Sequence, residues 1–140
     1  MELYFKDQRH RNFFTEATKQ FPQDCYHLSF LYLIGLTAET RQHFSSIYAC
    51  DGINLDVLSA GWQTSTTYKI TRLAFNLFND CHTDDWTTET NTAAYTVSEI
   101  FATPYAPYLM EAVKLRYPSY FRTKEHDICP FHNAAREPGV

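Results

Sequence analysis

The chain has 140 residues, of which 44% are hydrophobic and 16% aromatic, and its formal net charge is −4 at pH 7. This length and apolar content predict one compact domain over residues 1–140 and exclude a disordered chain. Because 12 basic residues stand against 16 acidic ones, there is no overall basic field, and direct nucleic-acid binding is disfavoured.

The sequence also bears on location. It contains no apolar run of about 18 residues, and its N-terminus lacks the pattern of a signal peptide. We therefore expect a cytoplasmic protein with no membrane partner. A disulfide framework is not expected there, so the thiols are core residues or metal ligands. The four cysteines are Cys25, Cys50, Cys81 and Cys129.

Two helices are predicted near the N-terminus. Residues 6–21 carry apolar side chains at helical spacing beside basic ones, and Pro22 ends the pattern. Asp24 can cap a second helix that starts at Cys25 and continues to about Leu36. This second segment is apolar on nearly all sides, so we expect it in the centre of the domain.

Three further helices are predicted in the middle of the chain. Residues 37–48 form one with Thr37 as its cap, and residues 53–62 form a short one. Residues 65–80 form a longer helix, because their apolar positions follow the i, i+3, i+4, i+7, i+8 pattern.

The last third alternates between loop and helix. Residues 79–95 are rich in Thr and Asp and predict a surface loop. A helical face starts near Val97 and runs toward Pro118, but Pro104 and Pro107 predict a kink or two stacked helices. Residues 122–140 are expected to be an irregular tail. The fold class is therefore all-α, a single-domain orthogonal bundle of about five to seven helices.

Residues that could contact a partner gather around the start of the 65–80 helix. Trp62 has two competing interpretations: it fills the core, or it anchors a partner together with Arg72, since Trp, Tyr and Arg are the usual hot-spot residues. The partner-binding hypothesis adds Lys69 and the loop carboxylates of Asp84 and Asp85.

The segment HDICPFH offers a metal site. His126, Cys129 and His132 are residue types that bind zinc, which takes about four ligands. The fourth ligand could come from Cys81 and His82 or from Cys25 and His27, although neither pair has the spacing of a strong zinc motif. The alternative is an ordinary tail in which the cysteine packs as a small apolar residue.

Evidence for an enzyme is close to absent. The sequence contains no phosphate-binding loop, dinucleotide fingerprint or nucleophile elbow. The adjacent Cys81 and His82 have the residue types of a nucleophile and base, but sequence neighbours on a loop rarely have the geometry. We expect a non-enzymatic protein without a cofactor, unless zinc binds. A nucleic-acid binder remains a third hypothesis, with these basic residues: Lys6, Arg9, Arg11 and Lys19.

Two blocks carry a resemblance to a known family. LSAGWQTSTTYKITRLAFNLFN (58–79) and PYAPYLMEAVKLRYPSYF (104–121) resemble an uncharacterised family of short proteins, a domain of unknown function, from gram-positive bacteria and their phages. The resemblance implies no reaction, cofactor or catalytic residue. It does imply a bacterial host and a setting of phages and mobile elements.

Small acidic proteins in that setting often inhibit bacterial defence systems, as anti-CRISPR proteins do. Carboxylates on one face can replace phosphates against a basic channel, while aromatic anchors supply affinity. The expected function is therefore a protein-binding module of phage or mobile-element origin, whose partner is a host protein such as a defence nuclease. The alternative is a zinc-stabilised domain or zinc-dependent hydrolase that uses the C-terminal His/Cys cluster.

Overall fold

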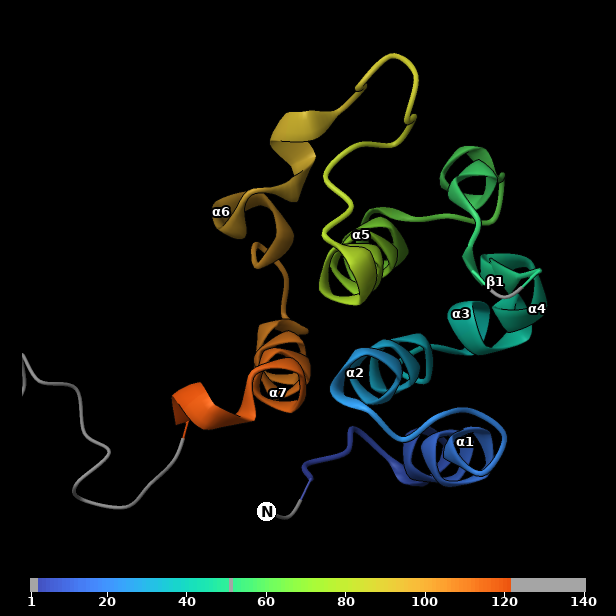
Figure 1. The fold of residues 1–140 in the computed structure, drawn as a ribbon, viewed down its shortest axis with the longest axis vertical. Coiled ribbons are helices and arrows are strands. Elements are labelled where there is room, and N and C mark those ends of the chain that lie inside the picture. The colour runs from blue at the N-terminus through green and yellow to red at the C-terminus, as the bar shows by residue number, and fades with distance from the viewer. Residues whose placement is uncertain (1–2, 51, 122–140) are drawn as a thin grey trace, which may run out of the picture.

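The computed structural model describes residues 3–50 and 52–121, and within these ranges the chain is mostly α-helical (Figure 1). The predicted all-α class is confirmed. Figure 1 shows helix α2 in the middle of the structure, with α1, α5 and α7 around it. The α-helices of the described ranges are α1 (Gln8–Thr18), α2 (Cys25–Ile34), α3 (Ala38–Gln42), α4 (Phe44–Ile47), α5 (Ser65–Asn79), α6 (Val97–Ile100) and α7 (Ala106–Arg116).

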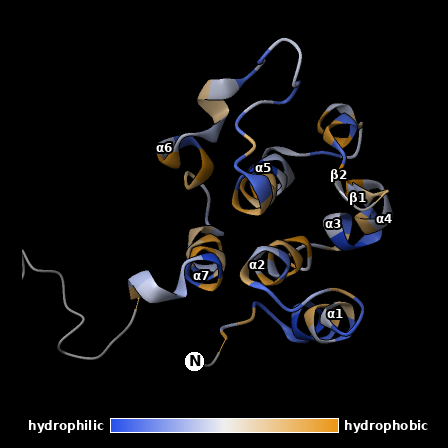
Figure 2. Ribbon diagram, in the orientation of Figure 1, coloured by the Kyte–Doolittle hydropathy of each residue, from blue (hydrophilic) through white to orange (hydrophobic). Residues whose placement is uncertain are grey.

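Helix α2 forms the centre of the core, as its sequence predicts. The side chain of Asp24 caps it by accepting the His27 N–H at 2.8 Å. Residues 29–34 are all buried, and α2 packs against α5 and α7. Figure 2 shows hydrophobic stretches, coloured orange, on all three helices. The buried Ser29 hydroxyl donates to the Cys25 carbonyl at 2.8 Å, so burying this polar group costs little free energy of folding. A helix that is apolar all round can thus pack against three neighbours.

Helix α1 packs closely against α2 through a buried histidine. His10 is fully buried, with its Nδ1 accepting the Lys6 N–H at 3.1 Å and its Nε2 lying 2.7 Å from the Tyr32 carbonyl. An Nε2–H tautomer satisfies both contacts, so the imidazole is neutral. Burial lowers the pKa of His10 to about 4, although the Tyr32 carbonyl opposes this effect. A Cβ on Gly35 would lie 2.9 Å from the Phe13 ring, so glycine permits this close approach.

Residues 37–62 are more broken than predicted. The expected 37–48 helix divides into α3 and α4 at His43, and its end becomes strand β1 (Tyr48–Ala49). Strand β1 pairs antiparallel with β2 (Gly52–Ile53).

The short helix predicted over 53–62 is present but shorter: it is the 3₁₀ helix η1 (Leu55–Ser59), and Ile53 belongs to strand β2. The Asn54 side chain accepts the Asp56 N–H at 3.2 Å, and the Asn54 carbonyl accepts the Val57 N–H at 3.3 Å. A hydrogen bond from the N–H of one residue to the carbonyl three residues earlier is the pattern of a 3₁₀ helix, which occurs in short pieces such as this one.

Helix α5 starts and ends with well-defined caps. Thr64 and Thr67 form a reciprocal capping box at its start. At its end, Asp80 adopts a left-handed conformation with φ 64°, a conformation that usually favours glycine and that Asp and Asn tolerate better than most other residues. This turn directs the following 81–91 loop back along α5.

The prolines divide the last helical region, as predicted. Helix α6 ends at Ile100, and α7 starts at Ala106 with Pro107 in its first turn, where the missing N–H removes no helical hydrogen bond. The described residues also form the 3₁₀ helices η2 (Thr92–Tyr95), before α6, and η3 (Pro118–Phe121), after α7.

Candidate protein-binding site

Hydrogen bonds and an ion pair hold the 81–91 loop against helix α5. Cys81 is buried, its carbonyl accepts from the Asn76 side chain at 3.0 Å, and its thiol lies 3.2 Å from the Thr83 carbonyl. Burial raises the pKa of the Cys81 thiol, so it stays protonated at neutral pH. The loop therefore begins with two buried residues, Cys81 and Thr83, rather than as a wholly solvated segment.

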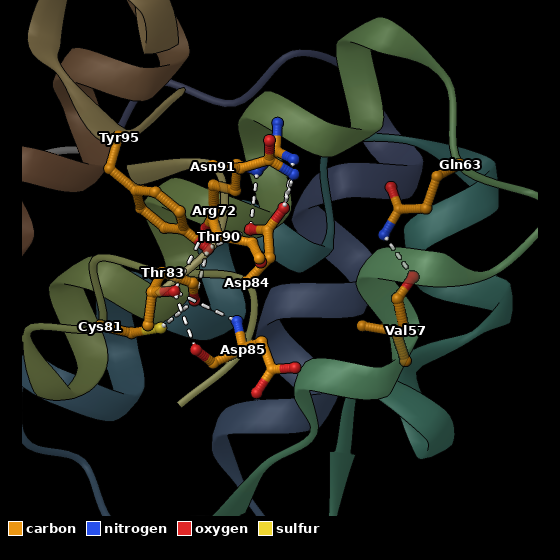
Figure 3. Close-up of polar contacts among 10 residues, drawn as sticks. All are labelled: Val57, Gln63, Arg72, Cys81, Thr83, Asp84, Asp85, Thr90, Asn91 and Tyr95. Carbon is orange, nitrogen blue, oxygen red and sulfur yellow. Dashed lines mark hydrogen bonds and ion pairs between the residues drawn. The ribbon is translucent and has the colours of Figure 1, made fainter. Parts of the chain in front are cut away.

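An ion pair connects the loop to the middle of α5 (Figure 3). Arg72 donates from Nη2 to Asp84 Oδ2 at 2.6 Å and from Nε to Oδ1 at 3.1 Å, a two-point contact. The two side chains are only 14% and 10% exposed. Tyr95 donates its hydroxyl to Asp84 at 2.7 Å, and Asn91 donates its amide at 2.8 Å. The carboxylate thus receives four hydrogen bonds from three side chains.

Aromatic rings complete the surroundings of the guanidinium. The Arg72 Cζ atom lies 4.8 Å from the ring centre of Tyr68 and 5.8 Å from that of Tyr95. Both distances allow a cation–π attraction. Residues from α5, the loop and η2 therefore converge on one charged pair, although they lie up to 27 positions apart in the sequence.

The electrostatics agree with this geometry. Burial alone would raise the pKa of Asp84, but the hydrogen bonds from Arg72, Tyr95 and Asn91 lower it below its usual range. Burial and the Asp84 carboxylate together raise the pKa of Tyr95. At neutral pH the cluster holds one carboxylate, one guanidinium and one neutral phenol, so its charges cancel.

A short turn then presents the next residues to solvent. Thr83 Oγ1 contacts the carbonyls of Asp85 and Thr90 at 3.0 and 3.1 Å, which closes the loop. Asp85 Oδ1 accepts from the Thr87 N–H at 2.9 Å and from its hydroxyl at 2.7 Å. The Thr87 hydroxyl bond is the main cause of a lowered pKa of Asp85. Trp86, between these two residues, is 55% exposed.

A cleft of about 250 Å³ separates this turn from helix η1. Its walls combine carboxylates with one indole and one leucine, which is a mixture suited to a long cationic or amphipathic side chain. The lining residues are Leu55, Asp56, Ser59, Asp84, Asp85, Trp86 and Thr87.

The residues predicted to bind a partner divide into two groups. Arg72 and Asp84 contact each other, and Asp85 follows directly on the cleft wall. Trp62 instead stacks on His43, with ring centres 4.3 Å apart and planes 3° from parallel. Lys69 donates to the Glu99 carbonyl at 2.6 Å and so connects α5 with α6.

The metal hypothesis gains no cluster from the described residues. Within 3–50 and 52–121 no group of three or more His, Cys, Asp or Glu side chains could hold a metal ion. Cys25 lies 3.7 Å from an Arg116 nitrogen, and His27 contacts Asp24. The segment that carries the proposed ligands lies outside the described residues, so zinc binding stays a prediction. Those ligands are His126, Cys129 and His132.

Several residues of this site were not predicted from the sequence, among them Asp56, Trp86, Asn91 and Tyr95. Trp86 had a local signal, because a tryptophan in a polar Thr/Asp-rich segment has no apolar face to join. Tyr95 and Asn91 had none, since their role depends on reaching Asp84 across the folded loop.

The fold and the site define a small helical protein with a polar, internally anchored loop. Residues 1–128 match the family described as "Family of unknown function (DUF6075)", and the chain belongs to this family. This confirms the predicted membership of an uncharacterised family of unknown function. Comparison with curated proteins and with solved structures finds no match. No helix among the described residues is long and apolar enough to cross a membrane.

Proposed function

We propose that the protein is a non-enzymatic protein-binding module of phage or mobile-element origin that inhibits a host defence nuclease, in the manner of anti-CRISPR proteins. The observation that carries this proposal is a half-exposed Trp86 on a loop whose position is fixed by the Asp84 network. A large aromatic side chain that is exposed on an ordered surface is typical of interaction hot spots.

The anchoring of the loop favours binding. An ordered loop loses little conformational entropy when a partner docks, so more of the contact energy appears as affinity. Here the backbone around Trp86 is held on one side by Asp84 and on the other by the bonds of Asp85 to Thr87.

The charge of this face indicates a basic partner. Asp56 and Asp85 lie on the exposed walls of the cleft beside Trp86. Carboxylates near an aromatic anchor complement the lysine- and arginine-rich channel of a nucleic-acid enzyme. Since the net charge is only −4, general charge mimicry of DNA is weak, and the indole must contribute much of the affinity.

The test is inhibition and capture of purified host defence nucleases by the full chain. We expect one of them to form a stable complex and to lose activity, and Trp86→Ala to abolish both effects. Tyr120→Ala is the matched control, since Tyr120 is 78% exposed on η3, away from the residues that line the cleft. Failure to inhibit or retain any nuclease, or a complex indifferent to Trp86→Ala, would contradict the proposal.

A further inference from the structure

We infer that the cleft between η1 and the 81–91 loop receives an arginine side chain of the protein partner. This inference rests on the proposed function and specifies the chemistry of the partner residue that the cleft selects. Three observations support it: the cleft itself, the exposed indole on its wall, and two carboxylates that form no ion pair with any described residue.

The size of the cleft suits a single side chain. Its volume of about 250 Å³ is below the roughly 300–1,000 Å³ of pockets that bind drug-sized ligands. Leu55 supplies apolar wall and Ser59 a hydroxyl, so the cleft can hold both an aliphatic stem and a polar head.

The charge of the cleft selects a cation. Asp84 lines it, but the charge of Asp84 is already balanced by Arg72. Asp56 and Asp85 also line it, and neither forms an ion pair with any described residue. Among the described residues, these two negative charges have no ion-pair partner, and the inference assigns them to a cation of the protein partner.

The protein already binds one of its own guanidinium groups with the same kinds of side chain, a carboxylate and aromatic rings. Arg72 meets a carboxylate in two-point contact while it lies near the rings of Tyr68 and Tyr95. The cleft repeats this combination with Trp86 as the ring and with Asp56 and Asp85 as the carboxylates. Tryptophan has the most favourable ring face for a cation.

Arginine fits this combination better than lysine. Its guanidinium is planar, so it can stack on an indole and at the same time donate two parallel hydrogen bonds to a carboxylate. An ammonium group is a more strongly hydrated point charge and loses more solvation on entering the cleft.

The test uses three short probes: N-acetyl-Gly-Arg-Gly-amide and its counterparts with lysine or citrulline in place of arginine. Binding is followed by NMR through the Trp86 indole N–H, which Trp62→Phe distinguishes from the second tryptophan. We expect the arginine probe to shift this signal saturably at millimolar concentration. Citrulline should cause no shift, because it is neutral, and lysine should bind more weakly.

Charge-removing variants locate the probe. Asp56→Asn and Asp85→Asn should each weaken binding about two- to fivefold, the range for one exposed ion pair. Asparagine at position 85 keeps the Oδ1 that accepts from Thr87, so the turn is preserved. Asp80→Asn is the matched control: it removes one charge outside the cleft, and asparagine tolerates the left-handed conformation there.

Three outcomes would overturn the inference: no shift with arginine, equal binding of lysine or citrulline, or equal loss of binding in Asp80→Asn. The probe experiment and the nuclease experiment test the two proposals separately. If the probe binds as expected but no nuclease is inhibited, the cleft selects arginine and the anti-defence role is wrong. If a nuclease is inhibited through Trp86 while the probe fails, the role holds and the arginine assignment is wrong.

Discussion

Helix α2 and the 81–91 loop are both held in one position, but by different forces. Residues 29–34 of α2 are fixed by burial among apolar side chains from three helices. The loop has only two fully buried residues, Cys81 and Thr83, and is held against α5 by hydrogen bonds and by the ion pair between Arg72 and Asp84. Burial is non-directional and depends weakly on ionisation, whereas the loop depends on a few charged atoms. The loop should therefore be separable from the core by small chemical changes.

The largest effect is expected from the core. Phe30→Ala removes a ring that is 1% exposed and packs against Tyr48, Phe75 and Phe78. We expect a loss of about 3–5 kcal/mol in the free energy of unfolding, because a cavity remains. Denaturant unfolding measures the loss, and hydrogen exchange should show core and loop becoming less protected together. A loss below about 1 kcal/mol would show that α2 is not the centre of stability.

The next effect breaks the attachment of the loop. Arg72→Met leaves the nearly buried Asp84 carboxylate without its counter-charge. We expect this to lower the free energy of unfolding of the 81–91 loop by about 3 kcal/mol. We expect hydrogen exchange to rise in the 81–91 loop while residues 29–34 of α2 stay protected. The double variant Arg72→Met/Asp84→Asn is the control, since it removes the stranded charge and should recover part of the loss. Uniform loss of protection across both regions would contradict the separation.

Acid should affect the two regions in different pH windows. The pKa of His10 is about 4 when folded and near 6.5 when unfolded, so the unfolded chain binds more protons between these values. Stability therefore falls by about 3 kcal/mol as pH decreases from 6.5 to 4. Asp84 has a folded pKa below its ordinary 3.8, so its contribution is complete above that value and is lost only at lower pH.

The variant His10→Gln has no imidazole at position 10, so it lacks the pH dependence that His10 gives to stability between pH 4 and 6.5. We expect the unfolding free energy of this variant to be nearly flat between pH 4 and 6.5, even though its value at neutral pH is lower. Denaturant unfolding across this range checks the slope, with His82→Gln as the exposed control. A wild-type chain without the slope would mean that burial does not lower the pKa of His10 in the folded state.

The smallest effect concerns one hydroxyl group of the loop network, that of Tyr95, which also lies 3.1 Å from the Thr83 carbonyl. Tyr95→Phe removes the hydroxyl that donates to Asp84 at 2.7 Å and leaves the ion pair with Arg72 intact. We expect a loss of about 1.5 kcal/mol, the lower end for a hydrogen bond to a charged group. Thermal unfolding and loop hydrogen exchange measure it. An effect as large as that of Arg72→Met would show that the phenol, rather than the guanidinium, holds the loop.

The sequence alone determined the helical class and the position of the central helix. The apolar run after Asp24 is buried in α2, and the caps at Asp24 and Thr37 are where they were expected. Pro104 and Pro107 lie between α6 and α7 or in the first turn of α7, as their missing N–H groups require. These features depend on neighbours within about one or two turns, so local pattern is sufficient to find them.

The tertiary structure decided the site. Arg72 and Asp84 could be named as partner-binding residues from composition, but only the fold shows that they bind each other. Trp62 stacks on His43, while Trp86 is left half exposed beside the cleft. Such contacts join positions far apart in the chain, and their geometry is set by how α5, the loop and η1 pack. Periodicity along the sequence carries no information about that packing, because it reports only the faces of single elements.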